Sequence, residues 1–402
     1  MGRLWLAALA ALALAGCAAQ GRPSAADPPP TGPHQPKAEV APATLDEMLE
    51  GSDFDLPRAL LLFSRDYYGD FAATPHTLDI EARLARFDQY GVELRRELGR
   101  RSSPRSRLLA LVDFVHSRLG LHFDSQDAAG ANPENLFLDR VLQSRRGYCV
   151  TLSLAYLVFG QAAGLDVHGV RLPGHFVVLY RDKEADGTPW QTLVETTTGG
   201  EPRDELDLWA QHRFSTTAVE ARVYLAPLTD REIFSTLFNN LAGVVYLRGN
   251  AEKALAHYQR ALELAPNNAE ALYNRALVLT GLGRPKDALK DLNAALRLDT
   301  NFVLALLARS GLLWKNNERD AALKDLAEAK RKRPDWPEPH LLEGGFCALE
   351  GRLDDARSAF QRALAADGKC KDAHLALAEL ERRAGNEQAA REHEKAAEEL
   401  HP

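Results

Sequence analysis

Cysteine is scarce in this chain, and its scarcity excludes several architectures. The sequence of 402 residues contains four cysteines, and an exported protein with so few is not built on a disulfide framework. No cluster of histidines and cysteines has the spacing of a zinc site, and no glycine-rich loop is placed to hold a phosphate. We therefore expect neither a metal ion nor another cofactor.

Excess positive charge is missing as well. The formal net charge is −7 at pH 7, with 49 lysines and arginines against 56 aspartates and glutamates. Acidic and basic residues are mixed along the chain, so most charges should lie on the solvated faces of helices. This balance gives no electrostatic footprint for nucleic acid, and we expect no nucleic-acid partner.

The N-terminus carries an apolar stretch, residues 4–14, that is too short to span a bilayer as a mature helix. The segment that follows resembles the lipobox of bacterial lipoproteins: Leu14-Ala15-Gly16-Cys17. The alternative is a plain secretory signal that is cut at small residues. The resemblance implies a signal peptide at 1–17 and a lipid on Cys17. Because no aspartate follows the cysteine, it also implies the outer membrane of a Gram-negative cell, facing the periplasm.

Composition and periodicity then change along the chain. Residues 18–44 are rich in alanine, proline, glycine and serine and cannot bury enough apolar surface to fold, so we predict a disordered tether. Apolar residues recur three and four positions apart over 45–121, and 150–164 is strongly apolar, which predicts helices. Short β-rich segments follow at 167–172, 176–181 and 190–196. The pattern predicts an α+β domain over 45–230, with helices first and an antiparallel sheet after them.

From about residue 235 the sequence repeats itself every 34 residues. Three series of small residues keep this spacing: Ala254, Ala288, Ala322, Ala356 and Ala390; Ala261, Ala295, Ala329, Ala363 and Ala397; and Gly249, Gly283, Asn317, Gly351 and Gly385. Glycine and asparagine tolerate the left-handed conformation that ends a helix. This is the tetratricopeptide signature, and it predicts an all-α solenoid of about five repeats over 231–402.

Of the four cysteines, Cys149 is the candidate reactive thiol. Cys17 is assigned to the lipobox, and we expect Cys347 and Cys370 to be core or helix-end residues of the repeats. An apolar helix begins at about Val150, so the sulfur of Cys149 would feel the positive end of its dipole, which favours the thiolate. Free backbone amides at that end could donate to an oxyanion.

His175 and Glu195 complete a candidate triad with this cysteine. A nucleophilic sulfur needs a base, and the base needs a third group to hold its ring. A hairpin turning around Ala185 would pair residue 175 with residue 195 and place the carboxylate against the imidazole. Asp182 and Asp186, in the expected turn, are alternative third residues. Taken singly, the three residues could also be a buried thiol, a structural histidine and a solvent-facing glutamate.

Three stretches resemble the bacterial branch of the transglutaminase-like superfamily that often carries tetratricopeptide repeats at its C-terminus. They are residues 135–142, 145–153 and 169–176, which read NLFLDRVL, RRGYCVTLS and GVRLPGHF. The resemblance covers about residues 50–230 and the repeats. It implies a papain-like core in which Cys149 is the nucleophile and His175 the base.

The same resemblance bears on three further residues. Gln143 lies six residues before the cysteine, a spacing that papain-like enzymes share, and is a candidate second oxyanion donor by analogy. Asn135 and Arg146 would have structural roles in the loop before the nucleophile. Two departures matter: many members of this branch have lost the cysteine, which this chain keeps, and the third residue, usually aspartate, is Glu195 here.

Stacked helix pairs form a groove that binds an extended peptide or the tail of a partner protein. By repeat phase, the candidate anchors in that groove are Asn239, Tyr246, Tyr273 and Trp314. The alternative is that some of them pack between repeats. The groove has no evident run of lysine or arginine, which disfavours the capture of an acidic tail.

Two functions from different classes follow. The first is an envelope lipoprotein whose Cys-His-Glu site hydrolyses or transfers an amide acyl group, as a cysteine protease, amidase or transglutaminase, while its repeats dock a protein or peptide. The second is a catalytically silent adaptor or assembly factor that works through its repeats. An inhibitor-like or peptidoglycan-binding role has no dedicated motif.

Overall fold

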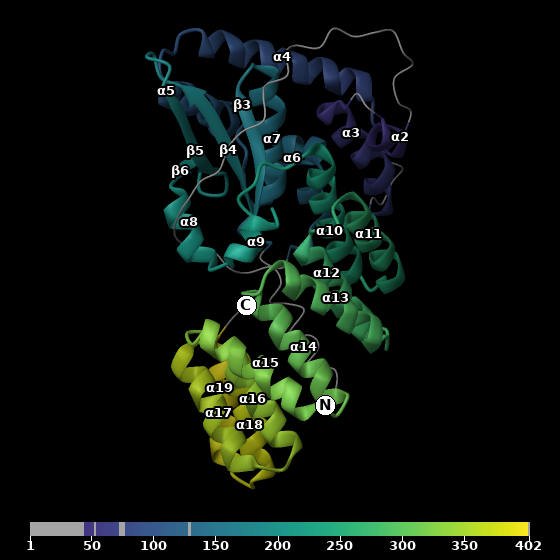
Figure 1. The fold of residues 1–402 in the computed structure, drawn as a ribbon, viewed down its shortest axis with the longest axis vertical. Coiled ribbons are helices and arrows are strands. Elements are labelled where there is room, and N and C mark those ends of the chain that lie inside the picture. The colour runs from purple at the N-terminus through teal and green to yellow at the C-terminus, as the bar shows by residue number, and fades with distance from the viewer. Residues whose placement is uncertain (1–43, 52–53, 72–76, 128–129, 401–402) are drawn as a thin grey trace. The chain divides into compact units, whose positions relative to one another are not determined.

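The structure is a computed structural model that describes residues 44–51, 54–71, 77–127 and 130–400. The predicted signal peptide, Cys17 and nearly all of the predicted tether lie outside these residues. Among the described residues, those up to Asn274 form one compact unit and those from Arg275 onward form a second. No helix within the described ranges is long and apolar enough to cross a membrane. The helices and strands are labelled in Figure 1.

The first unit begins with helices, as the apolar periodicity predicts. They are α2 (Leu45–Glu50), α3 (Leu56–Tyr67), α4 (Ile80–Leu98), α5 (Pro104–Asp113), α6 (Leu138–Ser144) and α7 (Cys149–Ala162). Every residue of α7 from Val150 to Gly160 is buried, which explains why this helix is apolar on all sides. Helix α4 passes close to it at Gly91, where an added Cβ would lie 2.8 Å from the Cβ of Ala162.

A four-stranded antiparallel sheet follows the helices, as predicted. Its strands lie in chain order: β3 (Asp166–Leu172), β4 (His175–Lys183), β5 (Pro189–Glu195) and β6 (Glu201–Arg203). Helix α7 packs against β3 and β4 (Figure 1). The predicted register is wrong by two residues, because Val178 pairs with Val194, and continuing this register places Glu195 opposite Val177 rather than His175.

Two short helices, α8 (Glu205–His212) and α9 (Thr216–Glu220), lead into the first helix pair of the repeats, α10 (Asp230–Leu247) and α11 (Ala251–Leu264). This pair packs on α3 through aromatic rings. Phe63 and Tyr67 contact Phe238 edge-on, at centroid distances of 5.4 and 5.3 Å. The first repeat is therefore packed with the α+β domain, and the boundary at residues 230 and 231 stays a prediction.

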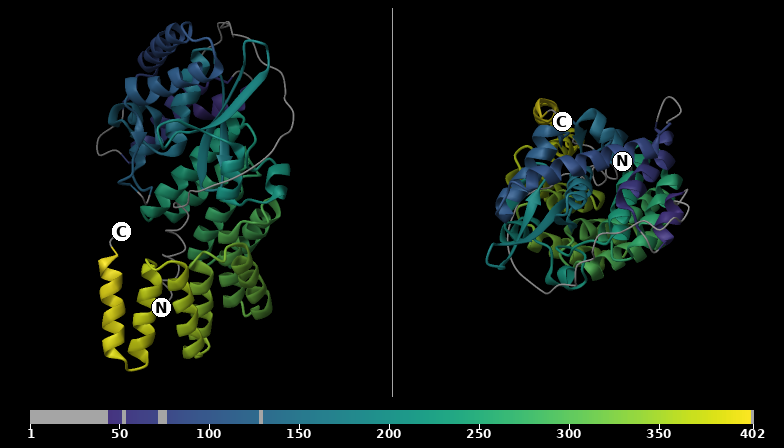
Figure 2. Two further views of the ribbon diagram at one scale, coloured as in Figure 1. Left: turned by 90° about the vertical axis from the view of Figure 1, so that its left-hand side faces the viewer. Right: turned by 90° about the horizontal axis from the view of Figure 1, so that it is seen from above.

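The remaining repeat helices continue the predicted pattern. They are α12 (Ala269–Gly281), α13 (Pro285–Leu298), α14 (Val303–Lys315), α15 (Arg319–Lys332), α16 (Glu338–Leu349), α17 (Leu353–Ala366), α18 (Lys371–Arg383) and α19 (Glu387–Glu399). The last helix pairs are drawn from a second side in Figure 2. Residues with positive φ end the first helix of each pair: Gly249, Gly283, Asn317, Gly351 and Gly385. The two series of repeated alanines are buried throughout, so the repeat read from the sequence is also the repeat of the packing.

Candidate active site

Cys149 is the first residue of α7 and follows an extended N-cap residue, Tyr148. The loop before it is tightly packed: an added Cβ on Gly147 would lie 3.0 Å from a methyl group of Val141. The hydroxyl of Tyr148 donates to the carboxylate of Asp127. These contacts fix the backbone from which the sulfur projects, at the end of a helix whose first amide groups have no intrahelical partner.

A buried polar network supports this loop. The side-chain nitrogen of Asn135 donates to Asp124 at 3.0 Å and to Asp127 at 3.4 Å, and the backbone carbonyl oxygen of Asn135 accepts from the Thr151 hydroxyl. The guanidinium of Arg146 lies 3.5 Å from the carboxylate of Asp124. Asn135 and Arg146 therefore hold the chain on either side of the nucleophile, which agrees with the structural roles that the resemblance implies.

His175 and Glu195 are both buried and form a direct pair. Nε2 of His175 lies 2.7 Å from Oε2 of Glu195, which leaves Nδ1 for a second partner. Cys149 lies close enough to the imidazole to affect its pKa. Burial alone lowers the pKa of His175, but its contacts with Cys149 and Glu195 outweigh burial and raise that pKa well above its usual value. The structure thus brings the three predicted residues together and favours an imidazolium beside the sulfur.

Glu195 is held at both carboxylate oxygens. Oε1 accepts hydrogen bonds from the backbone amide of Thr197 at 3.0 Å and from its hydroxyl at 2.6 Å. Burial raises the pKa of Glu195, but the hydrogen bond and charge of His175 and the two bonds from Thr197 bring it down to about 2. The group is therefore a carboxylate at any pH where the site could work.

The observed register explains why glutamate can stand where aspartate is usual. Glu195 lies opposite Val177, so His175 is its diagonal neighbour on the same face of the sheet. Such diagonal positions are ~7–8 Å apart, within reach of a long side chain. The shift by two residues in the register keeps both side chains on one face.

Thr196 ties the end of β5 to the start of α7. Its hydroxyl lies 3.4 Å from the carbonyl oxygen of Cys149 and 3.1 Å from the hydroxyl of Ser153. The strand that carries Glu195 and the helix that carries Cys149 are thereby fixed to each other.

The structure does not place the other candidates at this site. Gln143 is exposed near the end of α6, where its side-chain oxygen accepts from Arg140 at 3.1 Å. Asp182 forms an ion pair with Arg107 at 2.6 Å. Asp186 lies in the β4–β5 turn and accepts from the backbone of Thr188. Both alternative carboxylates therefore bind groups other than His175.

His212 is a site residue that the sequence reasoning missed. Its ring is parallel to that of His175, with centroids 6.2 Å apart and planes within 7°. Nδ1 lies 3.0 Å from the carbonyl oxygen of Pro173, which fixes it as the protonated nitrogen. Nε2 is buried and has no partner among the described residues. Burial, together with the charge of His175, lowers the pKa of His212 to about 4, so this second imidazole is neutral.

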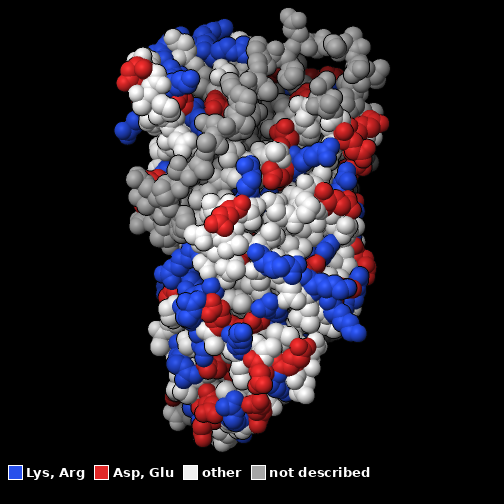
Figure 3. Space-filling view, viewed as in Figure 1, with Lys and Arg blue, Asp and Glu red and all other residues white. Residues whose placement is uncertain are grey.

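Three of the four candidate groove residues are buried. Tyr273 is 1% exposed, Trp314 5% and Asn239 6%, whereas Tyr246 is partly exposed. Trp314 stacks on Phe346, with centroids 3.9 Å apart. The alternative that some of these side chains pack between repeats therefore holds for Trp314, and Tyr273 is also withdrawn from the surface. Charges of both signs are mixed over the repeat helices on the face shown in Figure 3.

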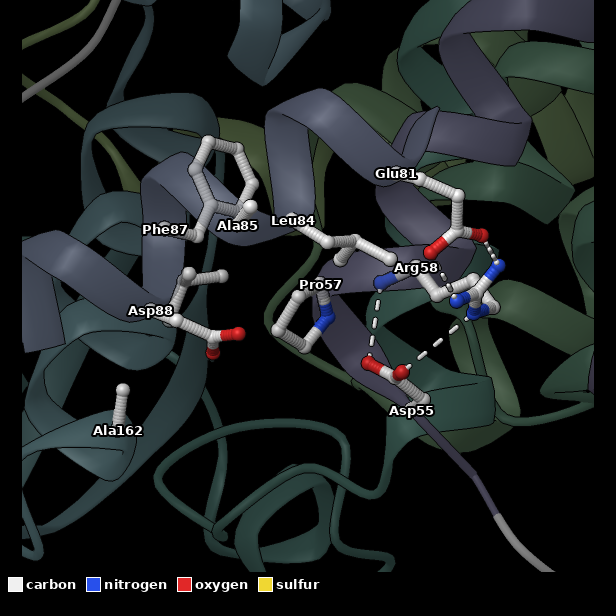
Figure 4. A pocket seen from close by; sticks show the side chains of 10 residues that line it. Asp55, Pro57, Arg58, Glu81, Leu84, Ala85, Phe87, Asp88 and Ala162 are labelled. Carbon is white, nitrogen blue, oxygen red and sulfur yellow. Dashed lines mark hydrogen bonds and ion pairs between the residues drawn. The ribbon is translucent and has the colours of Figure 1, made fainter. Parts of the chain in front are cut away.

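A pocket of about 350 Å³ lies elsewhere in the first unit, lined by residues of α3, α4 and α7 (Figure 4). Arg58 contacts Glu81 there at 2.7 Å and Asp55 at 3.7 Å. The pocket reaches Ala162, the last residue of α7, whereas Cys149 is the first. A helix of 14 residues separates its ends by about 20 Å, so this pocket is not the site of the triad.

Comparisons with known proteins agree with the geometry. The model of the transglutaminase-like superfamily matches residues 81–239. Models of the tetratricopeptide repeat match residues 233–301 and three overlapping stretches: 273–337, 307–368 and 350–402. The chain therefore has a transglutaminase-like superfamily domain followed by tetratricopeptide repeats. In the described part of the chain, no group of three or more His, Cys, Asp or Glu residues could hold a metal ion.

Individual relatives cover the chain to different extents. A UPF0162 protein of Xylella fastidiosa strain Temecula1 is 27% identical over 282 residues, which are 69% of this chain and 94% of that protein. Human DnaJ homolog subfamily C member 3 is 34% identical over 86 residues, 21% of this chain and 17% of that protein. The crystal structure of a tetratricopeptide protein of Thermus thermophilus is 26% identical, with a TM-score of 0.38 over 42% of this chain and 92% of its own.

Proposed function

We propose that this protein is a thiol-dependent enzyme that hydrolyses or transfers an amide acyl group. The observation that carries the proposal is the pair of contacts at His175. Nε2 meets the carboxylate of Glu195 at 2.7 Å, while the imidazole also interacts with Cys149. This is the order thiol, imidazole, carboxylate that nucleophilic acyl transfer requires.

The reaction would run in two halves. The thiolate of Cys149 attacks the substrate carbonyl, the imidazolium of His175 protonates the leaving amine, and a thioester forms. His175 then takes a proton from the acceptor, which attacks the thioester carbonyl; the C–S bond breaks, the acyl group leaves on the acceptor, and the thiolate–imidazolium pair is restored. Water as the acceptor gives a protease or amidase, and an amine gives a transglutaminase. Backbone amides at the start of α7 would stabilise the oxyanion in each half.

Two other groups would have supporting roles in this reaction. Glu195 orients the ring and stabilises the imidazolium, and it does not itself take up the proton. Thr197 holds the second carboxylate oxygen and so keeps Glu195 ionised. Replacing Thr197 by valine would remove the hydroxyl bond and keep the backbone bond.

We also propose that the protein is a lipoprotein of the cell envelope, attached through Cys17 and facing the periplasm. The support is the lipobox-like sequence before Cys17 and the composition of residues 18–44, which suits a tether. Labelled fatty acid should enter the wild-type protein and not the Cys17→Ala variant. Equal labelling of both would reject lipidation at this residue.

The repeats would bring a protein or peptide to the enzyme. Tetratricopeptide repeats suggest protein or peptide binding, because stacked helix pairs form an extended concave surface. Of the candidate anchors, Tyr246 keeps a partly exposed ring and is therefore the residue to replace first.

The test is the rate at which iodoacetamide alkylates Cys149 from pH 5 to pH 9, followed by mass spectrometry of the peptide. A working site reacts rapidly below pH 7, and both His175→Ala and Glu195→Ala abolish this fast reaction. A slow reaction that neither substitution changes would reject the enzyme and favour the adaptor acting through its repeats.

A further inference from the structure

The turn that presents His175 is unusual for a tight hairpin. Strands β3 and β4 pair up to Leu172 and His175, so Pro173 and Gly174 form a two-residue loop. The turns that suit such loops, types I′ and II′, need a positive φ at the first residue. Proline fixes φ near −65°, and Gly174 has a φ of 65°, which is the pattern of a type II turn.

The peptide group at the centre of this turn is held at both ends. The carbonyl of Pro173 accepts from Nδ1 of His212 at 3.0 Å. The amide of Gly174 donates to the carboxylate of Glu270. His212 ends α8, whereas Glu270 lies in the first turn of α12, a tetratricopeptide helix. Two segments that are distant in the sequence therefore each form a hydrogen bond with this one peptide group.

These two hydrogen bonds fix the orientation of that peptide group. Type I and type II turns differ by a flip of their central peptide, which changes φ of the third residue from about +80° to about −90°. In this turn the third residue is Gly174, and His175 is the next residue along the chain. A flipped peptide would therefore turn the backbone from which the imidazole projects, and it would lose both hydrogen bonds.

Burial raises the pKa of Glu270 on balance, although three neighbouring groups act in the opposite direction. Its charge interacts favourably with Arg171 and with His175. Arg171 is 1% exposed, and its Nε and Nη1 have no hydrogen-bond partner among the described residues. Burial raises the pKa of Glu270, opposed by the Gly174 amide and these two cationic neighbours. A charge-assisted bond to a backbone amide is roughly twice as strong as a neutral one.

We propose that Glu270 and His212 are positioning residues for His175, so that a tetratricopeptide helix completes the active site of the transglutaminase-like domain. The proposal rests on the proposed function, in which His175 is the base. It means that the repeats do more than dock a partner: one of them holds the turn on which the geometry of the base depends.

The repeat provides a matched control. Residues at the phase of Glu270 in the five repeats are Thr236, Glu270, Leu304, Glu338 and Asp372. Glu338 is also partly buried in the first turn of its helix, α16, and it lies in the second compact unit. A general effect of losing a first-turn glutamate should appear at both positions, and an effect on the site should appear at Glu270 alone.

The experiment measures alkylation of Cys149 by iodoacetamide in the full chain. Glu270→Ala should slow it by about 10²-fold, the cost of misplacing a catalytic group by ~1 Å. His212→Leu should slow it similarly, and His212→Asn, which keeps a donor, should restore most of the rate. Glu338→Ala should leave it unchanged. Wild-type rates in both Glu270→Ala and His212→Leu would overturn the proposal.

A second variant covers the case in which Glu270→Ala fails to fold. Glu270→Gln keeps an acceptor for Gly174 and removes the charge that favours the imidazolium. The upper inflection of the alkylation profile, where the imidazolium loses its proton, should then move to lower pH, a change that a structural role would not cause; an unmoved profile at the wild-type rate counts against the proposal. His175→Ala distinguishes failure of this proposal from failure of the proposed function. If the wild-type protein is alkylated slowly and His175→Ala is alkylated at the same rate, the proposed enzyme function itself is rejected.

Discussion

Two cysteines of this chain start helices, one in each compact unit, and their surroundings differ sharply. Cys149 is the first residue of α7, and Cys370 is the N-cap residue of α18. Burial, helped by nearby acidic residues such as Asp372, raises the pKa of Cys370 to about 11. Cys149 instead interacts with His175, an imidazole whose own pKa is raised.

Cys370 shows that a position at a helix N-terminus does not by itself lower the pKa of a thiol. The backbone bond from Ala373 lowers the pKa of Cys370, yet burial and the acidic neighbours outweigh it. At Cys149 the decisive partner comes from a strand that is distant in sequence. The sheet, which carries His175 and Glu195, is therefore what distinguishes the surroundings of Cys149 from those of Cys370.

The largest expected effect comes from removing this partner. In the wild type, Cys149 should react with iodoacetamide at pH 6.5 at least ~10⁴-fold faster than Cys370, and His175→Ala should narrow this ratio by about 10²-fold without closing it, because burial still raises the pKa of Cys370. Mass spectrometry of both peptides from one sample measures the ratio. Cys347, which is buried, reports on any general unfolding. If the two cysteines of the wild-type protein reacted at similar rates, the proposed difference in reactivity between Cys149 and Cys370 would be wrong.

The next effect concerns the carboxylate and its dependence on pH. The pKa of Glu195 is lowered from 4.5 to about 2, so its stabilising contribution is present above pH 4.5 and is lost as the pH falls towards 2. This contribution is on the order of 3 kcal/mol. Glu195→Gln should lack it, so the variant's free energy of unfolding should fall less than that of the wild type between pH 5 and pH 3.

Urea denaturation at several pH values tests this expectation. Glu392→Gln is the control, because Glu392 is an exposed glutamate of α19. The imidazole has the opposite sign: the pKa of His175 is raised, so its contribution is present below pH 6.5 and is lost as the pH rises through the folded value. Parallel curves for Glu195→Gln and the wild type would contradict the assignment of the pair.

A smaller effect should appear at Cys370. Asp372→Asn removes one of the charges that raise the pKa of Cys370 but leaves its burial. We expect its alkylation at pH 8 to rise about three-fold, which corresponds to half a pKa unit. Glu387→Gln, in the first turn of the next helix, is the matched control. No change at Cys370 would show that burial alone keeps this thiol protonated.

The helices, strands and repeats were predictable because their signals are local and periodic. The register of the β4–β5 hairpin was not, since its loop centres on Asp186 rather than Ala185: Glu184 bonds to Thr188 across the turn, and Gly187 has a φ of 86°. A loop's centre depends on turn geometry, which the alternation of side chains does not encode.

The three residues of the candidate triad could be named from the sequence, but the contacts that hold them could not. Cys149, His175 and Glu195 have residue types that chemistry demands. His212 and Glu270 act instead on the backbone of a turn, and many residue types can donate to a carbonyl or accept from an amide. Because such contacts leave no motif and join segments far apart in sequence, only the folded chain reveals them.

The smallest expected effect is on stability and concerns the N-termini of α7 and α18. Cys370 is an N-cap residue that gives α18 no capping bond from its side chain, and serine is among the preferred residues there because its hydroxyl accepts from the N2 or N3 amide. Cys370→Ser should raise the free energy of unfolding by about 0.5–1 kcal/mol. Cys149→Ser should give no such gain, since residue 149 lies inside the helix, yet it should remove all alkylation of the site. Urea denaturation of both variants compares them, and an equal gain in both would mean that the two helix starts are alike after all.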